Sequence, residues 1–254
     1  MSTLRLEVRD RIAFLTIDRP EALNALNAPT IQSLHEHVVA LDERADVRVV
    51  VLTGAGPKSF VAGADIAEFA GYSPAEGEAL ARRGHELLFN RIAQARKPYI
   101  AAINGFALGG GLELAMACHV RLASSTARMG LPEASLGVIP GYGGTQRLAQ
   151  LVGKGRALEL MFSASMIDAA KAESWGLVNA VHEPEQLMEV AEAMARQFIK
   201  ASGDAQSAII RTVNAATEGG PGFEAEIHEF GARFATAEFT EGTTAFLEKR
   251  KPSF

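Results

Sequence analysis

Cysteine is almost absent from this chain of 254 residues, because only Cys118 occurs. A single thiol excludes an intrachain disulfide and is typical of a reducing compartment. No apolar run approaches the roughly 18 residues that a membrane-spanning helix needs. The opening segment "MSTLRLEVRDRIAFLTIDRP" carries acids early and has no apolar stretch before a cleavage site, unlike a signal or transit peptide. We therefore expect a soluble cytoplasmic protein without a membrane anchor.

The chain also lacks the basic excess that nucleic-acid binding requires. Lysine and arginine together number 25 against 30 acidic residues, which gives a formal net charge of −5. A mildly acidic surface argues against a nucleic-acid partner, although a local cluster of donors still permits a small anionic ligand.

Several common catalytic motifs are missing. "GYGGTQ" has Gln146 where a dinucleotide fingerprint needs its last glycine, and "GAGPKS" lacks the Gly-Lys pair of a phosphate-binding loop. No G-x-S-x-G or H-E-x-x-H occurs, and His35 and His37 are two apart on an expected helix, so they face different sides. Cys118 closes an apolar segment and is expected in the core. The sequence therefore predicts no metal site and no nucleotide-binding loop.

Apolar patterning predicts an α/β core followed by a helical part. A helix opens at Pro29 and Thr30 and continues to about residue 41, and another is expected at about 75–95. After Glu183 only helical patterns remain, at 185–201, 205–217, 223–235 and 240–250, with a break at Gly219–Gly222. We thus expect an α/β domain over 1–183 and a helical region over 184–254. Strands are expected at about 11–18, 47–54, 97–105, 119–125 and 176–183.

The segment "NGFALGGGLELAMAC" breaks two local rules at once. Gly109 to Gly111 cost conformational entropy, and Glu113 places a carboxylate inside an apolar run. Such violations concentrate at functional sites. The segment is therefore a candidate site.

Two further segments, "VAGADI" and "LPEASLGVIPGYGGTQRL", complete a chemical constellation. Turns at Ala64 and Gly110 are suited to direct two backbone N–H donors at one carbonyl oxygen, which is an oxyanion hole. Glu113 and Glu133 would supply two acid/base groups, and together these features suit proton chemistry beside a carbonyl.

The glycines and glutamates of this candidate site also have a simpler, purely structural interpretation. The glycines would then only permit a tight turn, and each glutamate would only complement a helix N-terminus, with Pro132 at a first helical position before Glu133. From the residues alone, acyl-carbonyl chemistry is one candidate.

The chain resembles the enoyl-CoA hydratase/isomerase (crotonase) superfamily over nearly its whole length. The similarity runs through "LTIDRPEALNALN", "VVVLTGAGPKSFVAGADI", "KPYIAAINGFALGGGLELAMACHV", "GLPEASLGVIPGYGGTQRL" and "WGLVNAV" to "FLEKRKPSF". It implies a spiral of repeated ββα units followed by a helical trimerisation region. Where the family often carries Asp after the cysteine, this chain has His119, which is expected to be structural.

The resemblance assigns roles by position. Ala64 and Gly110 match the two N–H donors that hold the thioester oxygen, and Glu113 and Glu133 match the catalytic glutamates. The residues that match the lining of the CoA channel are Ala62, Gly63, Asp65 and Ile66, and those that match tail contacts to CoA, often from a neighbouring subunit, are Phe246 and Lys249.

The activity implied is reversible syn addition of water to a trans-2-enoyl-CoA in fatty acid or related acyl-CoA degradation. Coenzyme A is then part of the substrate, no separate cofactor is expected, and the protein is a trimer or a dimer of trimers. The alternatives are a Δ3-Δ2 enoyl-CoA isomerase or another crotonase-type acyl-CoA lyase. A non-catalytic acyl-CoA or RNA-binding relative is disfavoured by the intact glutamates and the acidic charge.

Overall fold

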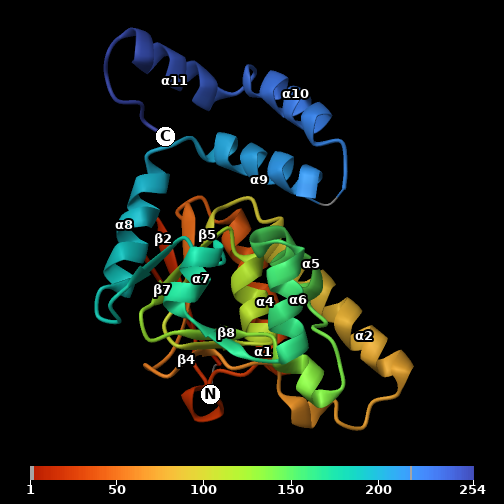
Figure 1. Ribbon diagram of the computed structural model, residues 1–254. Coiled ribbons are helices and arrows are strands. Elements are labelled where there is room, and N and C mark those ends of the chain that lie inside the picture. Colours follow the sequence, from red (N-terminus) through yellow and green to blue (C-terminus); the bar gives the residue numbers. More distant parts are fainter. Residues whose placement is uncertain (1–2, 218) are drawn as a thin grey trace.

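Two β-sheets form the centre of the molecule, which the computed structural model describes over residues 3–217 and 219–254 (Figure 1). Five of the six strands of the larger sheet run parallel, and β1 pairs antiparallel with β2. In spatial order these strands are β1 (Leu4–Arg9), β2 (Ile12–Ile17), β3 (Val49–Gly54), β5 (Tyr99–Ile103), β7 (Val120–Ser124) and β10 (Ala180–His182).

The smaller sheet has four strands of three residues each. In order they are β4 (Ser59–Val61), β6 (Phe106–Leu108), β8 (Arg128–Gly130) and β9 (Met166–Asp168). The first three run parallel, so their carboxyl ends share one edge, and β9 pairs antiparallel with β8.

The chain passes alternately through the two sheets and then into a helix. The pair β3–β4 leads to α2 (Pro74–Gly84), β5–β6 leads to α4 (Gly110–Ala117), and β7–β8 leads through the 3₁₀ turn η4 (Pro132–Leu136) to α5 (Gly144–Val152). This succession is the expected spiral of ββα units.

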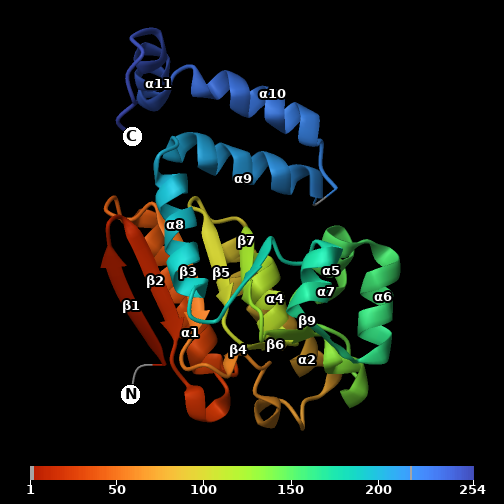
Figure 2. The ribbon, with the colours of Figure 1, turned by 60° about the vertical axis from the view of Figure 1, so that its left-hand side comes forward.

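The strands β2, β3 and β5 of the larger sheet are buried on both faces, which explains their uninterrupted apolar runs. Alternate residues such as Val49 and Val51 pack against α8 (Leu187–Ile199), which lies across the strands (Figure 2). Val50 and Leu52 face the opposite cluster, which includes α1 (Ala28–Glu43) and α4. The predicted strands at about 11–18, 47–54, 97–105 and 119–125 are confirmed, and the one predicted at 176–183 is shortened to β10.

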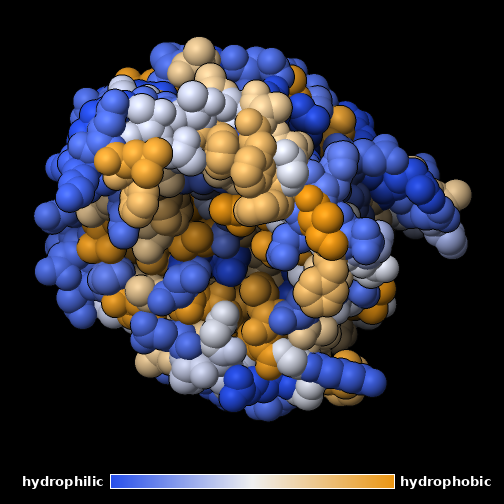
Figure 3. Space-filling view, turned by 90° about the horizontal axis from the view of Figure 1, so that it is seen from above, coloured by the Kyte–Doolittle hydropathy of each residue, from blue (hydrophilic) through white to orange (hydrophobic). Residues whose placement is uncertain are grey.

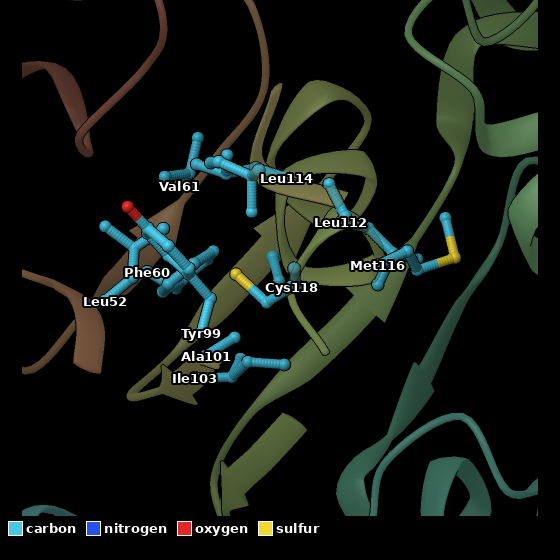
Figure 4. Packing of buried hydrophobic residues seen from close by; sticks show 14 of the residues in the cluster. Leu52, Phe60, Val61, Tyr99, Ala101, Ile103, Leu112, Leu114, Met116 and Cys118 are labelled. Atoms are coloured by element: carbon cyan, nitrogen blue, oxygen red, sulfur yellow. The ribbon is translucent and has the colours of Figure 1, made fainter. Parts of the chain in front are cut away.

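Cys118 lies in this core, as predicted. Figure 4 shows it among Tyr99, Ala101 and Leu114, between the strands and α4. Burial raises the pKa of its thiol to about 12, so the group remains an uncharged apolar filler.

The helix expected at about 75–95 is continuous but changes between α-helical and π-helical geometry. After α2 the backbone forms a π-helical turn, η3 (His85–Phe89), and then α3 (Asn90–Ala93). A capping box between Ser73 and Glu76 starts α2. The remaining short elements are η1 (Pro20–Ala22), η2 (Ile66–Glu68), α6 (Lys154–Ser163) and α7 (Ala169–Trp175).

Beyond β10 the described chain contains helices and no strand, as the patterning predicts. After α8 come α9 (Gly203–Thr217), α10 (Gly222–Arg233) and α11 (Ala237–Leu247), which form a layer away from the sheets (Figures 1 and 2). The proposed boundary at residues 183 and 184 stays a prediction, and α8 just beyond it packs on the larger sheet. Among the described residues, no helix is both long and apolar enough to cross a membrane.

Candidate active site

The three glycines at the start of α4 differ in how strongly the fold requires them. Gly109 has φ of +50°, a conformation that side chains rarely adopt, and Gly111 packs so tightly that a Cβ atom would lie 1.9 Å from the Val61 carbonyl oxygen. A Cβ atom on Gly110 would meet only ordinary contacts, at 3.5 Å or more. The fold therefore needs Gly109 for the turn and Gly111 for packing, whereas neither backbone strain nor packing requires glycine at position 110.

Gly110 lies beside Ala64, the other residue predicted to donate a backbone N–H to the thioester oxygen. The position of its missing Cβ is 3.6 Å from the Ala64 backbone nitrogen. In a parallel bridge, the Leu26 N–H donates to Gly63 O and the Leu26 carbonyl oxygen accepts from the Asp65 N–H. The bridge therefore uses backbone groups on either side of Ala64 and none of Ala64 itself. The Ala64 N–H therefore points away from Leu26. The Gly110 N–H is the first of α4 and has no acceptor within the helix.

Glu113 is 1% exposed and is fixed by one oxygen. Its Oε1 accepts hydrogen bonds from the Tyr142 N–H at 2.8 Å and from the Gly144 N–H at 2.7 Å. Because Gly144 begins α5, Glu113 accepts from the N-terminus of that helix, and it also lies in the first turn of its own helix, α4. Burial outweighs these bonds and raises the pKa of Glu113 to about 7.

The second predicted carboxyl group, that of Glu133, lies next to Gly109. Its Oε1 would lie 2.7 Å from a Cβ atom on Gly109, so the absence of that atom gives the carboxyl group its place. Its Oε2 is buried and has no hydrogen-bond partner in the described chain, and burial raises the pKa of the group. An unpaired, protonation-prone carboxyl group is suited to hold a proton for transfer.

These groups converge on one cavity of about 270 Å³. Ala64, Gly110, Glu113 and Glu133 all line it. The remaining lining is largely apolar and includes Phe69, Leu80, Leu108, Leu136, Val138, Ile139 and Tyr142.

The predicted CoA-channel residues divide into two groups. Ala62, Gly63 and Ile66 line the same cavity. Asp65 lines an adjoining cavity of about 300 Å³, where its Oδ2 lies 3.8 Å from Arg19 Nη2.

The two predicted tail residues lie outside the cavity within this chain. Phe246 is 82% exposed and Lys249 is also exposed. Neither lines the cavity that holds the two glutamates. Their assignment to CoA stays a prediction that needs a neighbouring subunit.

Sequence reasoning did not identify the support for Glu113. The ring of Tyr142 stacks on Phe89 at 4.6 Å between centroids, and a Cβ atom on Gly84 would lie 2.3 Å from that ring. Arg147 Nη1 donates to the Tyr142 carbonyl oxygen at 3.0 Å. The signal was present in "GYGGTQRL", where glycines surround the tyrosine that anchors the glutamate.

His119 is structural, as expected. Its Nδ1 accepts a hydrogen bond from the Tyr99 N–H at 2.9 Å, and its Nε2 faces Ala93 O at 3.3 Å. Burial lowers the pKa of His119 to about 4, so the ring is neutral at pH 7. Within the residues that the structure covers, no group of three or more His, Cys, Asp and Glu side chains is arranged to hold a metal ion.

Fold and site geometry define a protein of the crotonase fold class. The structure of Pseudomonas aeruginosa DspI superposes with a TM-score of 0.94 at 36% identity, covering 100% of this chain and 97% of that one. An enoyl-CoA hydratase from Bacillus anthracis superposes with a TM-score of 0.92 at 34% identity, covering 100% and 99%.

The chain belongs to the enoyl-CoA hydratase/isomerase family, whose sequence profile matches residues 7–254. A short-chain-enoyl-CoA hydratase of Clostridium acetobutylicum is 44% identical over 255 residues, which cover 99% of this chain and 97% of the relative. A crotonyl-CoA hydratase of Syntrophomonas wolfei is also 44% identical, over 254 residues that cover 98% and 96%.

Proposed function

We propose that the protein catalyses the reversible syn hydration of trans-2-enoyl-CoA to 3-hydroxyacyl-CoA. One observation supports this activity most directly. The backbone N–H groups of Ala64 and Gly110 and the carboxyl groups of Glu113 and Glu133 belong to residues that line the same largely apolar cavity. The names of the relatives, a short-chain-enoyl-CoA hydratase and a crotonyl-CoA hydratase, make crotonyl-CoA the first substrate to assay.

In the proposed mechanism the Ala64 and Gly110 N–H groups donate to the thioester oxygen as it gains negative charge. The Glu113 Oε2 atom, which has no hydrogen-bond partner in the described chain, takes a proton from a water molecule whose oxygen then bonds to the β-carbon. Glu133 delivers a proton to the α-carbon. The two transfers add one water molecule across the double bond, so coenzyme A stays attached and no further cofactor is required.

The two glutamates distinguish hydration from the alternative, Δ3-Δ2 isomerisation. Isomerisation moves one proton between carbons, so Glu133 with its unpaired Oε2 would suffice. In that case Glu113→Gln would spare double-bond migration and Glu133→Gln would abolish it. We expect the wild-type protein to hydrate a 2-enoyl-CoA in a side-by-side assay with a 3-enoyl-CoA. Rapid isomerisation without any hydration would overturn the proposal.

The pH dependence of hydration should report Glu113. Its carboxylate must be ionised to accept a proton, and burial raises its pKa to about 7. Measured as kcat/KM, the rate should therefore rise as the pH increases through about 7. The rise should be absent from the residual rate of Glu113→Gln. A wild-type rate that is flat from about pH 5 to 8 would contradict the assignment.

We also infer that the protein assembles as a trimer or a dimer of trimers in the cytoplasm. The helices after α8 expose large apolar side chains, and Figure 3 shows hydrophobic residues around a hollow on the face seen from above. Those on α10 and α11 and the turn between them are Phe223, Ile227, Phe230, Phe234, Phe246 and Leu247. A neighbour's Phe246 and Lys249 would then contact CoA.

Light scattering should give a trimer or hexamer at micromolar concentration, and Phe230→Ser should lower the assembled fraction, because Phe230 is 67% exposed in the single chain. A stable wild-type monomer at that concentration would refute the inferred assembly.

A further inference from the structure

A second and larger cavity lies behind the loop that anchors Glu113. Its volume is about 820 Å³, and it opens between α9 and the helices α3, α4 and α5 of the core. Gly143 and Arg147 line it, whereas Tyr142 and Glu113 line the acyl cavity. The two cavities have no lining residue in common.

The charge of this second cavity is opposite to that of the whole chain. Two guanidinium groups, those of Arg121 and Arg147, line it, and none of the described lining residues is Asp or Glu. The protein as a whole has a net charge of −5. Side-chain amides supply further polar groups, from Asn90, Gln94, Gln146, Gln150 and Asn214.

Arg121 is the lining residue whose guanidinium donors are not all used within the described part of the protein. It is only 6% exposed, and it donates from Nε to Leu177 O at 2.8 Å and from Nη1 to Cys118 O at 2.7 Å. Its remaining nitrogen, Nη2, has no hydrogen-bond partner among the described residues. A buried cation without a carboxylate is costly, and burial accordingly lowers the pKa of Arg121.

Arg147 contributes positive charge to the same space. Its Nη2 donates to Asn90 Oδ1 at 2.8 Å, while its Nη1 donates to the anchoring loop. Cys118, whose carbonyl oxygen accepts from Arg121 Nη1, also lines the cavity.

We propose that this cavity binds a small oxyanion of the carboxylate or phosphate type, with Arg121 Nη2 as its principal donor. A guanidinium group is planar and presents parallel N–H donors that match two oxygens of such an anion. Gln146 and Gln150 on α5 add side-chain amides to the same lining. The bound anion would supply the negative charge that the cavity lining lacks.

Thermal unfolding of the full-length protein with inorganic phosphate tests the site, with sodium chloride at equal ionic strength as the reference. Phosphate at ten times its Kd should raise Tm by about 3–5 °C above the reference. A parallel series with succinate shows whether carboxylate oxygens suffice. Because binding is read without turnover, the result is separate from that of the hydration assay.

Three variants locate the effect. Arg121→Gln should abolish the phosphate-dependent rise in Tm. Gln146→Glu adds a carboxylate of the same shape at an exposed lining position, so it should fold normally and also abolish the rise. Gln197→Glu makes the same change at an exposed position on α8 outside the cavity and should keep it.

Loss of the rise in Gln146→Glu alone supports the site even if Arg121→Gln does not fold. If neither anion stabilises the wild-type protein beyond chloride, or if the rise persists in Gln146→Glu, the proposal is wrong. If a neighbouring copy fills the cavity in the assembled protein, neither anion will stabilise the wild-type protein beyond chloride.

Discussion

Glu113→Gln should lower the hydration of crotonyl-CoA by a factor of about 10² to 10⁴ while leaving acyl-CoA binding nearly unchanged. The replacement keeps an oxygen that accepts from the Tyr142 and Gly144 N–H groups. It removes only the second oxygen, which would take the proton from water. Steady-state kinetics and a binding titration with a saturated acyl-CoA measure the two effects. Hydration that survives within about threefold would exclude Glu113 as the base.

The same variant should not be less stable, which separates chemistry from folding. The pKa of Glu113 is about 7 in the folded protein against 4.5 for a free side chain, so the folded state binds more protons between these values. Its stability therefore falls as the pH rises across this interval, by about 3 kcal/mol in total. Glu113→Gln lacks this penalty and should melt no lower than wild type at pH 8, with the advantage disappearing below about pH 4.5. Glu189→Gln, at an exposed position of α8, is the matched control.

Gly110→Ala should fold normally and lose hydration by at least a factor of about 10², the usual loss for one oxyanion donor. The added Cβ atom meets the protein only at ordinary distances, and alanine favours a helix more than glycine does. It would, however, lie 3.6 Å from the Ala64 nitrogen, in the space that the thioester oxygen must enter to reach that N–H group. Gly110→Val should be more severely affected, because its branches extend further into that space.

The neighbouring glycine supplies the contrast. Gly111→Ala would press its Cβ atom against the Val61 carbonyl oxygen, so it should unfold at a lower temperature or fail to fold. Melting curves and kcat/KM for the two alanine variants separate the roles. A well-folded Gly110→Ala protein with near-normal turnover would remove Gly110 from the oxyanion hole.

The parts of the fold that the sequence predicts are those with long, regular patterns. The apolar runs of β3 and β5 predict strands buried on both faces, and the periodicity of α1 and of the helices after residue 184 holds over several turns. The glycine run with its embedded carboxylate predicts a site because two local costs coincide there. The assignment of roles to Ala64 and Glu133 depends on the family resemblance and stays a prediction.

The smaller sheet could not be predicted in the same way. Strands of three residues, such as β4 and β6, are too short for any periodicity to appear. β1 also escapes sequence analysis, because four of its six residues are exposed and it carries charges. The anchoring of Glu113 by Tyr142 and Gly144 joins residues about thirty positions apart, which local pattern analysis does not detect.

The edge of the smaller sheet has a consequence for how this chemistry can change. Ala64 follows β4, Gly110 follows β6 and Glu133 follows β8, so three of the residues that we propose to act on the thioester lie on turns that leave neighbouring parallel strands. Strands in a sheet are spaced about 4.8 Å apart, and each turn is held by its own strand. The proposed proton donor, Glu133, can thus be exchanged on the third turn while the first two turns keep their geometry. A scaffold of this kind lets new reactions of thioesters arise one turn at a time, without rebuilding the part that polarises the carbonyl group.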